Sequence, residues 1–273
     1  MNSKWCNNLV KGKSPYILPN TTEFKLKLDH IENTFELPIL TMPTLETVHR
    51  YPVKSSIYNT FIQNLNTYLK FDSEYIFTNG SDNALKLILD TFVDINSSVF
   101  VPVPTYPHFQ LFLSCKTNNI YNLHIDLNDH VDDIFNKLNI GLQKNTSDIC
   151  YLANPNLPLG YTLKHNQIQA LIEKFNETLF IIDEAYIEYC SEKSTIHLTK
   201  QYNNIIVTRT FSKYFGLAGI RLGYITSSPQ LLQDMKAIYN AKDISLHAMQ
   251  IANQALTHSH HYKEILTSVY KIK

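Results

Sequence analysis

A lysine in this sequence stands next to a hydroxyl residue and eight residues before an arginine: Ser212, Lys213 and Arg221. A lysine amine can form a Schiff base with a carbonyl compound, while a neighbouring hydroxyl and guanidinium can hold an anion. A single lysine after a strand is more often a surface residue. The chemical interpretation therefore depends on what other reactive groups the fold brings to Lys213.

A carboxylate is the first such group. Asp183 directly follows Leu179–Ile182, an apolar run that predicts a buried strand. A carboxylate at the end of a buried strand must be paired with a cation, hydrogen-bonded, or have a functional role that offsets the cost of burying it. Lys213 comes 213 − 183 = 30 residues later, which leaves room for one crossover and a neighbouring strand.

A second group is a candidate anion cradle. Asn79, Gly80, Ser81 and Asp82 lie between a predicted strand and a predicted helix that begins at about Asn83. A glycine turn with a Ser/Asp cap presents unpaired backbone N–H groups and the positive end of the helix dipole, which suit a phosphate. Most such caps bind nothing, so this signal is weak alone.

The elements that would position these groups alternate between strand and helix from about residue 75 to 225. The strands are apolar runs, which predicts an α/β fold in three layers, with a mainly parallel sheet covered by helices on both faces. Open sheets of this kind bind ligands at the carboxyl ends of their strands. We expect strands at 24–28, 75–78, 98–104, 120–125, 148–152, 179–182 and 205–207, and helices at 57–70, 83–92, 108–115, 131–138 and 167–175, with further helical periodicity beyond Tyr224.

Composition excludes several classes of function. The 273 residues have a formal net charge of zero, which argues against nucleic acid or an anionic membrane as a partner. The four cysteines are scattered without a C-x-x-C pair, so neither a metal site nor a redox motif is expected. No signal segment and no membrane-spanning apolar run is seen, and we expect a cytoplasmic location.

The string RTFSKYFGLAGIRLGY at residues 209–224 resembles the lysine motif of the fold type I aminotransferases, which use pyridoxal 5′-phosphate (PLP). Within that group the chain is most similar to histidinol-phosphate aminotransferase and threonine-phosphate decarboxylase, over roughly residues 14–260. The resemblance implies a PLP-binding large domain at 51–240, an N-terminal arm at 1–50, and a helical segment at 241–273 in place of the small domain. It also implies a homodimer that acts on a small-molecule amino donor and a 2-oxo acid.

Residue roles follow from this resemblance. Lys213 is the implied catalytic residue, which joins PLP as a Schiff base and then moves the Cα proton. Asp183 would bind the protonated ring nitrogen, Tyr186 would donate to the ring O3′, and Tyr106 would stack on the ring. Arg209 could serve the cofactor or only the structure. The residues implied to hold the cofactor phosphate are Gly80, Ser81, Asp82, Ser212, Arg221 and, from the partner subunit, Tyr51.

The chain also departs from the family pattern. Residues 154–160 read NPNLPLG where the family has NPNNPTG, so Leu157 replaces an asparagine that donates to O3′. Asn154 or Asn156 could substitute through a shift of the loop. Glu32 and Asn33 keep part of an N-E-N-P element that lies near the substrate in the family. No arginine follows Arg221, although the family's small domain supplies one for the substrate carboxylate.

Three functional interpretations remain open at this point. A transaminase of the histidinol-phosphate type is favoured. A PLP-dependent decarboxylase of the threonine-phosphate type is the first alternative, because the residues that select the reaction lie in the small domain. A degenerate or split relative that binds PLP without full turnover is the second.

Overall fold

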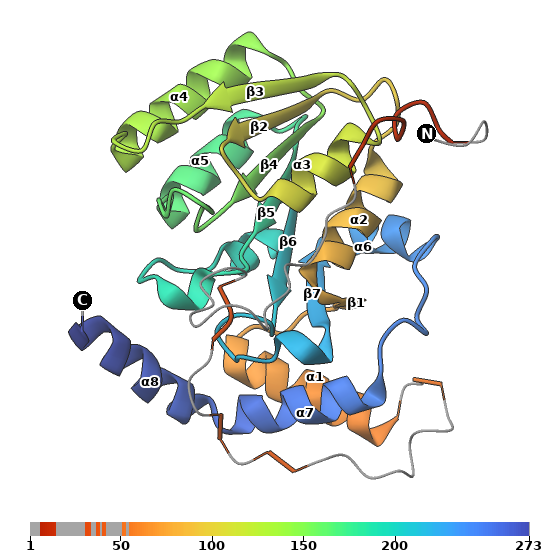
Figure 1. Ribbon diagram of the computed structural model, residues 1–273, viewed down its shortest axis with the longest axis vertical. Coiled ribbons are helices and arrows are strands. Elements are labelled where there is room, and N and C mark those ends of the chain that lie inside the picture. The colour runs from red at the N-terminus through yellow and green to blue at the C-terminus, as the bar shows by residue number, and fades with distance from the viewer. Residues whose placement is uncertain are drawn as a thin grey trace.

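A seven-stranded sheet forms the centre of the computed structural model, which describes residues 6–14, 31–33, 37–38, 40–41, 51–52 and 55–272 (Figure 1). The strand order is β1-β7-β6-β5-β4-β2-β3. β7 pairs antiparallel with both β1 and β6, and the other described pairs are parallel, which confirms the mainly parallel sheet. The strands are β1 (Ile76–Asn79), β2 (Val99–Val103), β3 (Ile120–His124), β4 (Ile149–Ala153), β5 (Leu179–Asp183), β6 (Ile205–Thr210) and β7 (Leu222–Ser227).

Helices cover both faces of the sheet, as the alternation predicted. One face packs against α2, α3 and α6 in a single apolar cluster. The opposite face packs against α4 and α5 in another. The helices are α1 (Ser56–Leu69), α2 (Gly80–Phe92), α3 (Pro107–Ser114), α4 (Val131–Lys144), α5 (His165–Lys174), α6 (Pro229–Lys236), α7 (Leu246–Thr257) and α8 (Ser259–Ile272).

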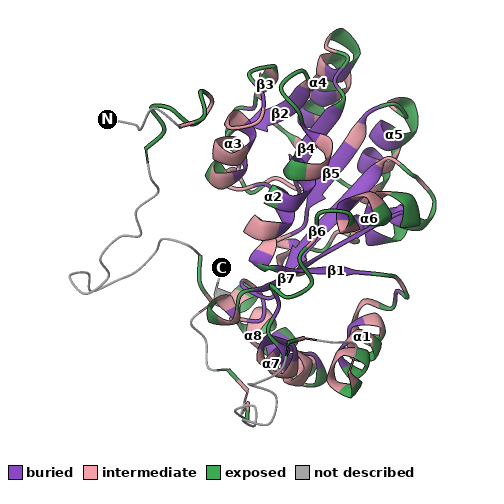
Figure 2. Ribbon diagram, turned by 90° about the vertical axis from the view of Figure 1, so that its right-hand side faces the viewer, coloured by how far each residue is buried: buried purple, intermediate pink, exposed green. Residues whose placement is uncertain are grey.

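Side-chain alternation along the strands explains this two-sided core. In β5, Ile181 belongs to the cluster under α2, α3 and α6, whereas Phe180 and Ile182 belong to the cluster under α4 and α5. Successive residues of a strand point to opposite faces, so a strand covered on both sides must be apolar throughout. Figure 2 shows the resulting buried layer of strands between more exposed helices.

A third apolar cluster lies beyond one end of the sheet. There α1 and α7 lie side by side, and α8 continues from α7 toward the loops that follow β5 and β6 (Figure 1). Phe61 of α1 contacts Phe77 of β1 and Phe211, with ring centroids 5.2 and 5.8 Å away. None of the helices within the described residues is both long and apolar enough to span a membrane.

Several element boundaries differ from the predictions. The helix expected from Asn83 begins at Gly80, because a positive φ of 75° at this glycine turns the chain directly out of β1. Strand β6 continues through Thr210, and α4 continues to Lys144. Strand β7 was not predicted. The strand predicted at 24–28 lies outside the described residues.

Candidate active site

Five of the predicted site residues line one small cavity at the carboxyl ends of the central strands. Its volume is about 50 Å³. Ser81 comes from the first turn of α2, Tyr106 from the end of the β2 loop, and Asp183 from the last position of β5. Tyr186 follows Asp183, and Lys213 lies just beyond β6. Five residues that are far apart in the sequence therefore lie around one cavity.

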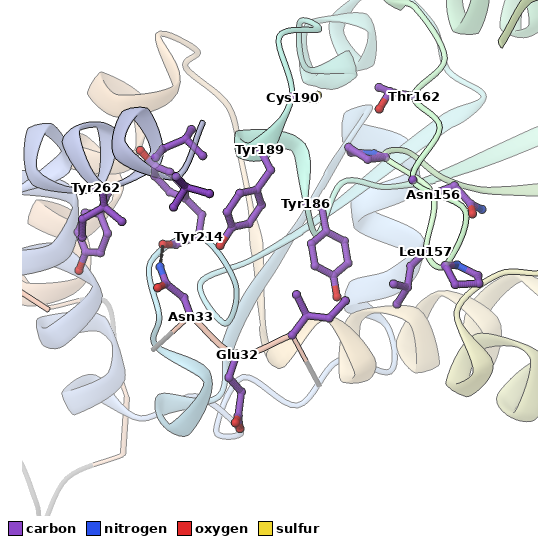
Figure 3. Close-up of a pocket in the computed structure, with 17 residues that line it drawn as sticks. Glu32, Asn33, Asn156, Leu157, Thr162, Tyr186, Tyr189, Cys190, Tyr214 and Tyr262 are labelled. Atoms are coloured by element: carbon purple, nitrogen blue, oxygen red, sulfur yellow. Dashed lines mark hydrogen bonds between the residues drawn. The ribbon is translucent and has the colours of Figure 1, made fainter. Parts of the chain in front are cut away.

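A larger cavity of about 430 Å³ adjoins the first one (Figure 3). Pro155, Leu157 and Tyr186 line both spaces, so the two share a wall. The larger cavity lies between the loop after β4, the turn after β5, residues 31–33 and helix α8.

Asp183 is a buried carboxylate held from two neighbouring strands. Its Oδ1 accepts a hydrogen bond from Thr208 Oγ1 of β6 at 3.0 Å, and its Oδ2 accepts one from the Tyr151 hydroxyl of β4 at 3.0 Å. Burial raises the pKa of Asp183 to about 6, against the lowering effect of these two hydrogen bonds. A cation placed beside this carboxylate would stabilise its charged form.

Lys213 lines the same cavity and is partly buried, with its Nζ 5.5 Å from the centre of the Tyr186 ring. Burial lowers the pKa of the Lys213 amine, while the carboxylates of Asp82 and Glu32 act in the opposite direction. A lowered pKa increases the fraction of neutral, nucleophilic amine near neutral pH. The environment therefore suits a lysine that attacks a carbonyl carbon or moves a proton.

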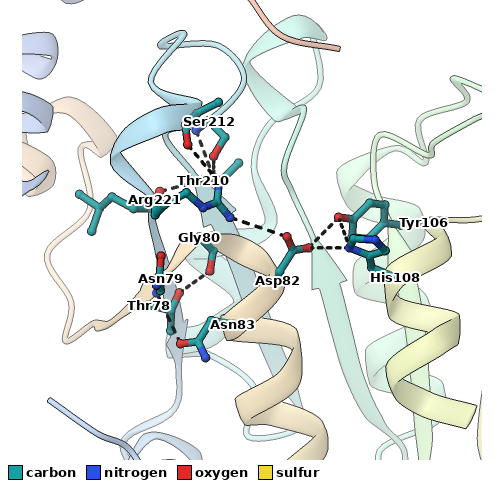
Figure 4. Close-up of polar contacts among 12 residues, drawn as sticks. Thr78, Asn79, Gly80, Asp82, Asn83, Tyr106, His108, Thr210, Ser212 and Arg221 are labelled. Carbon is teal, nitrogen blue, oxygen red and sulfur yellow. Dashed lines mark hydrogen bonds and ion pairs between the residues drawn. The ribbon is translucent and has the colours of Figure 1, made fainter. Parts of the chain in front are cut away.

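The start of α2 and Arg221, which are predicted to form an anion cradle, lie next to each other (Figure 4). The first-turn N–H groups of a helix have no partner within it, and the cap residue Asn79 makes no side-chain capping bond. Arg221 Nη2 lies 3.7 Å from Asp82 Oδ2. A Cβ at Gly80 would lie only 2.4 Å from the same Nη2. Glycine at this position lets the guanidinium approach the helix start.

Two further hydroxyl groups border this cradle. Ser212 is buried, and its backbone N–H donates to Thr210 Oγ1 at 3.1 Å, which orders the turn leading to Lys213. The Tyr106 hydroxyl donates to Asp82 Oδ1 at 2.6 Å. Burial and this hydrogen bond raise the pKa of Tyr106, so its phenol stays neutral. Asp82 is thus held between Tyr106 and Arg221.

Comparison with known families identifies the chain. Residues 43–273 match the family model described as aminotransferase class I and II. The chain belongs to the aminotransferase class I and II family. Among its relatives in this family, the dihydroxyacetone phosphate transaminase of Campylobacter jejuni is 34% identical over 192 residues, which cover 70% of this chain and 51% of the relative.

Other members of the family show a similar partial overlap. The histidinol-phosphate aminotransferase of Christiangramia forsetii is 34% identical over 64% of this chain and 55% of the relative. That of Ruminiclostridium cellulolyticum is 29% identical over 87% of this chain and 69% of the relative. The chain thus spans about half the length of the first two curated relatives.

Solved structures confirm the aminotransferase fold. Histidinol-phosphate aminotransferase from Sinorhizobium meliloti, in complex with pyridoxal-5′-phosphate, superposes with a TM-score of 0.71 at 24% identity, over 81% of this chain and 60% of that one. L-threonine-O-3-phosphate decarboxylase from Porphyromonas gingivalis gives 0.66 at 21% identity, over 80% and 66%. At these identities the likeness establishes the PLP-transferase fold.

Like most of the cradle residues, Tyr51 and Arg209 are not among the described residues that line the small cavity. Tyr51 is 70% exposed, and Lys242 Nζ lies 5.2 Å above its ring. Its implied contact with a neighbouring subunit stays a prediction. Arg209, for which a structural role was left open, forms ion pairs with Glu188 and with Glu184, whose Oε2 is 3.9 Å from Arg209 Nε.

The two asparagines considered as replacements at Leu157 serve the loop itself. Asn154 exchanges hydrogen bonds with the backbone of Leu163, at 2.7 and 3.2 Å. Asn156 Oδ1 accepts from the Leu159 N–H at 3.0 Å. Leu157 lines the small cavity, whereas neither asparagine is among the described residues around it.

Sequence reasoning missed the two hydrogen-bond partners of Asp183 in the candidate site. Tyr151 lies in the otherwise apolar run ICYLA of β4, and Thr208 directly follows the apolar run of β6. A hydroxyl within a fully buried strand needs a partner, which was the available signal. The register that places Thr208 beside Asp183 is visible only in the folded sheet.

Proposed function

We propose that this chain is a PLP-dependent transaminase of the histidinol-phosphate aminotransferase type, which transfers an amino group between an amino donor and a 2-oxo acid. One observation carries the proposal: Lys213, Asp183 and Ser81 line one space, and Arg221 lies beside the start of α2 next to Ser81. An amine, a carboxylate and an anion site are the three groups that the aldehyde, ring nitrogen and phosphate of PLP require.

The residues present fit this cofactor. Asp183 has a pKa raised to about 6 by burial, and a cationic ring nitrogen beside it would offset the cost of burying its charge. The cradle offers backbone N–H groups at the start of α2 and the Arg221 guanidinium to a phosphate. When bound, PLP supplies the electron-withdrawing ring that makes the substrate Cα proton removable.

Each residue then has a defined task. Lys213 Nζ holds the cofactor and moves a proton at the substrate Cα, a role that its lowered pKa favours. Tyr151 and Thr208 fix both oxygens of Asp183, so the carboxylate keeps its direction. Tyr186 and Tyr106 line the cavity and are proposed to contact the ring. Ser81, Asp82, Gly80, Ser212 and Arg221 are proposed to surround the phosphate.

Assembly and location belong to the same proposal. The exposure of Tyr51 supports a role for its ring in a homodimer. A cytoplasmic location and the division into an arm at 1–50, a PLP-binding domain at 51–240 and a helical segment at 241–273 remain predictions. Sedimentation of the purified chain with PLP would test the dimer.

The test of the function is cofactor capture followed by turnover. Purified protein with PLP should develop yellow absorbance, and borohydride should fix the cofactor to the peptide that contains Lys213, as read by mass spectrometry. Lys213→Ala should abolish this attachment, and the control Lys200→Ala should not. Attachment to Lys213→Ala protein would contradict the assignment.

Turnover separates the reaction types. An amino donor such as glutamate should bleach the yellow absorbance and yield the matching 2-oxo acid. Release of carbon dioxide in place of oxo-acid formation would identify a decarboxylase. A yellow protein that no donor changes would refute transamination by this chain.

A further inference from the structure

The 430 Å³ cavity beside the candidate cofactor site has a distinctive lining (Figure 3). Its volume lies within the range of small-molecule sites, about 300–1,000 Å³. Four tyrosines line it: Tyr186, Tyr189, Tyr214 and Tyr262. Aliphatic side chains of α8, including Val269, complete one side. Aromatic rings and aliphatic groups therefore make up most of the wall, to which Glu32, Asn33 and Thr162 add polar groups.

Its position connects it to the reacting lysine. Leu157 and Tyr186 line this cavity and also the small cavity that contains Lys213 and Asp183. A substrate whose amine lies at Lys213 would therefore extend its side chain past Leu157 into the larger space. The wall at that passage is an aliphatic group and a phenol ring.

The tyrosine rings form a connected array. Tyr214 makes an edge-on contact with Tyr189, with ring centroids 5.9 Å apart at 82°, and a tilted contact with Tyr262 at 5.8 Å. Such arrays accept a further aromatic ring in edge-on or offset geometry. Rings already packed on one another also lose little side-chain entropy when a ligand binds.

The charge near the cavity also bears on the ligand. Glu32 lines it, and its charge partly opposes the lowering of the Lys213 pKa by burial. A carboxylate on the wall repels a phosphate dianion and tolerates a neutral ring. Asn33, the next residue, donates from Nδ2 to the Tyr214 carbonyl at 2.8 Å, which ties residues 31–33 to the aromatic wall.

We propose that this cavity binds the side chain of the amino donor, and that the preferred side chain is aromatic and carries no phosphate. The proposal rests on the transaminase function proposed above and specifies its substrate class. It differs from the phosphate esters in the names of several relatives, among them dihydroxyacetone phosphate and histidinol phosphate.

The test compares two ligands that lack an amine and so need no turnover. 3-Phenylpropionate and 3-phosphonopropionate share the same carboxylate and linker, and differ only in the terminal phenyl or phosphonate group. Calorimetric titration of the PLP-loaded full chain should show at least about tenfold tighter binding of the phenyl ligand, as expected for burying most of a ring. Equal binding, tighter phosphonate binding, or no binding of either ligand would overturn the proposal.

A pair of charge variants on α8 locates the binding. Val269 faces the cavity, whereas Thr267 on the same helix is exposed and is not among the residues that line it. Val269→Arg should weaken 3-phenylpropionate binding and strengthen 3-phosphonopropionate binding, each by about tenfold. Thr267→Arg adds the same charge outside the cavity and should change neither. Identical effects of the two variants would mean that the ligand binds elsewhere.

The cofactor function and the aromatic preference can each be refuted without refuting the other. Borohydride capture at Lys213 tests the cofactor function and needs no substrate side chain. Loss of capture with intact 3-phenylpropionate binding in the cofactor-free protein would refute the transaminase and leave an aromatic binding site. Intact capture with a preference for the phosphonate would refute only the aromatic preference.

Discussion

Removal of Arg209 should strongly destabilise the chain, because it would leave buried carboxylates without their cation. Arg209 is 5% exposed on β6 and pairs with Glu188 and Glu184. Glu184 is 0% exposed but accepts three other hydrogen bonds, from Ser194 Oγ and from the N–H and Oγ1 of Thr195. Glu188 therefore depends more on Arg209 than Glu184 does.

The size of the effect follows from this geometry. Breaking a buried ion pair by deleting one partner costs about 3–5 kcal/mol, a large part of the usual 5–15 kcal/mol of domain stability. We expect Arg209→Met to lower the free energy of unfolding by that amount, as measured by urea unfolding at pH 8. The loss should shrink toward pH 4.5, the ordinary pKa of a glutamate, because neutral Glu188 needs no cation.

The direction of this pH dependence can be derived. Burial already raises the pKa of Glu188, and Arg209 opposes that rise. Without Arg209 the pKa of Glu188 in the folded state rises further. The variant is therefore most stable below the pKa that Glu188 has in the unfolded chain, and it loses stability as pH rises through the pKa that Glu188 has in the folded chain. Adding Glu188→Gln should restore part of the stability at pH 8. A loss below about 1 kcal/mol that does not vary with pH would refute this account.

Further substitutions address the cradle and Asp183. Gly80→Ala should lower the free energy of unfolding by about 1–2 kcal/mol, because the φ of this residue is 75°. It should also displace the Arg221 guanidinium and weaken PLP binding about tenfold. The control Gly219→Ala, which has open space around it, should change neither quantity when unfolding and PLP binding are titrated in parallel. Tyr151→Phe removes a donor to Asp183, so the pKa of Asp183 should rise above about 6. Because the pKa of Asp183 is higher in the folded state than its unfolded value of 3.8, its contribution to stability is lost as pH rises through the folded pKa. In the cofactor-free variant, the thermal midpoint should therefore keep falling up to a higher pH than in the cofactor-free parent. An unchanged pH profile would show that Tyr151 does not control this carboxylate.

The sequence predicted the layers of the fold because buried parallel strands are apolar throughout and stand out against amphipathic helices. It did not predict β7, because Arg221 directly precedes that strand, Gly223 lies within it, and only three of its six residues are apolar or aromatic. Gly223 is needed there because a Cβ would lie 2.8 Å from the backbone of Gly80 and Ser81. That close approach between distant segments has no local signature.

The candidate site, like the fold, was only partly predictable from the sequence. Lys213 and Asp183 were predicted because each occupies a position with a local pattern, a motif string or the end of an apolar run. The hydrogen bonds that fix Asp183 come from Tyr151 and Thr208, which its strand meets only through sheet pairing. Similarly, the shared wall at Leu157 between the two cavities results from loops folding together.

The antiparallel strand β7 has a consequence for how the chain is made. β1, which leads into the proposed phosphate cradle, pairs with β7 in the described sheet, and Ile76 meets Ile225, 225 − 76 = 149 residues later. On a ribosome, the cradle segment would therefore emerge long before the strand that holds it. Its exposed edge is open to pairing with other chains until then. A nascent chain that ends before residue 222 would keep the lysine segment and yet lack the strand that joins β1 to the rest of the sheet.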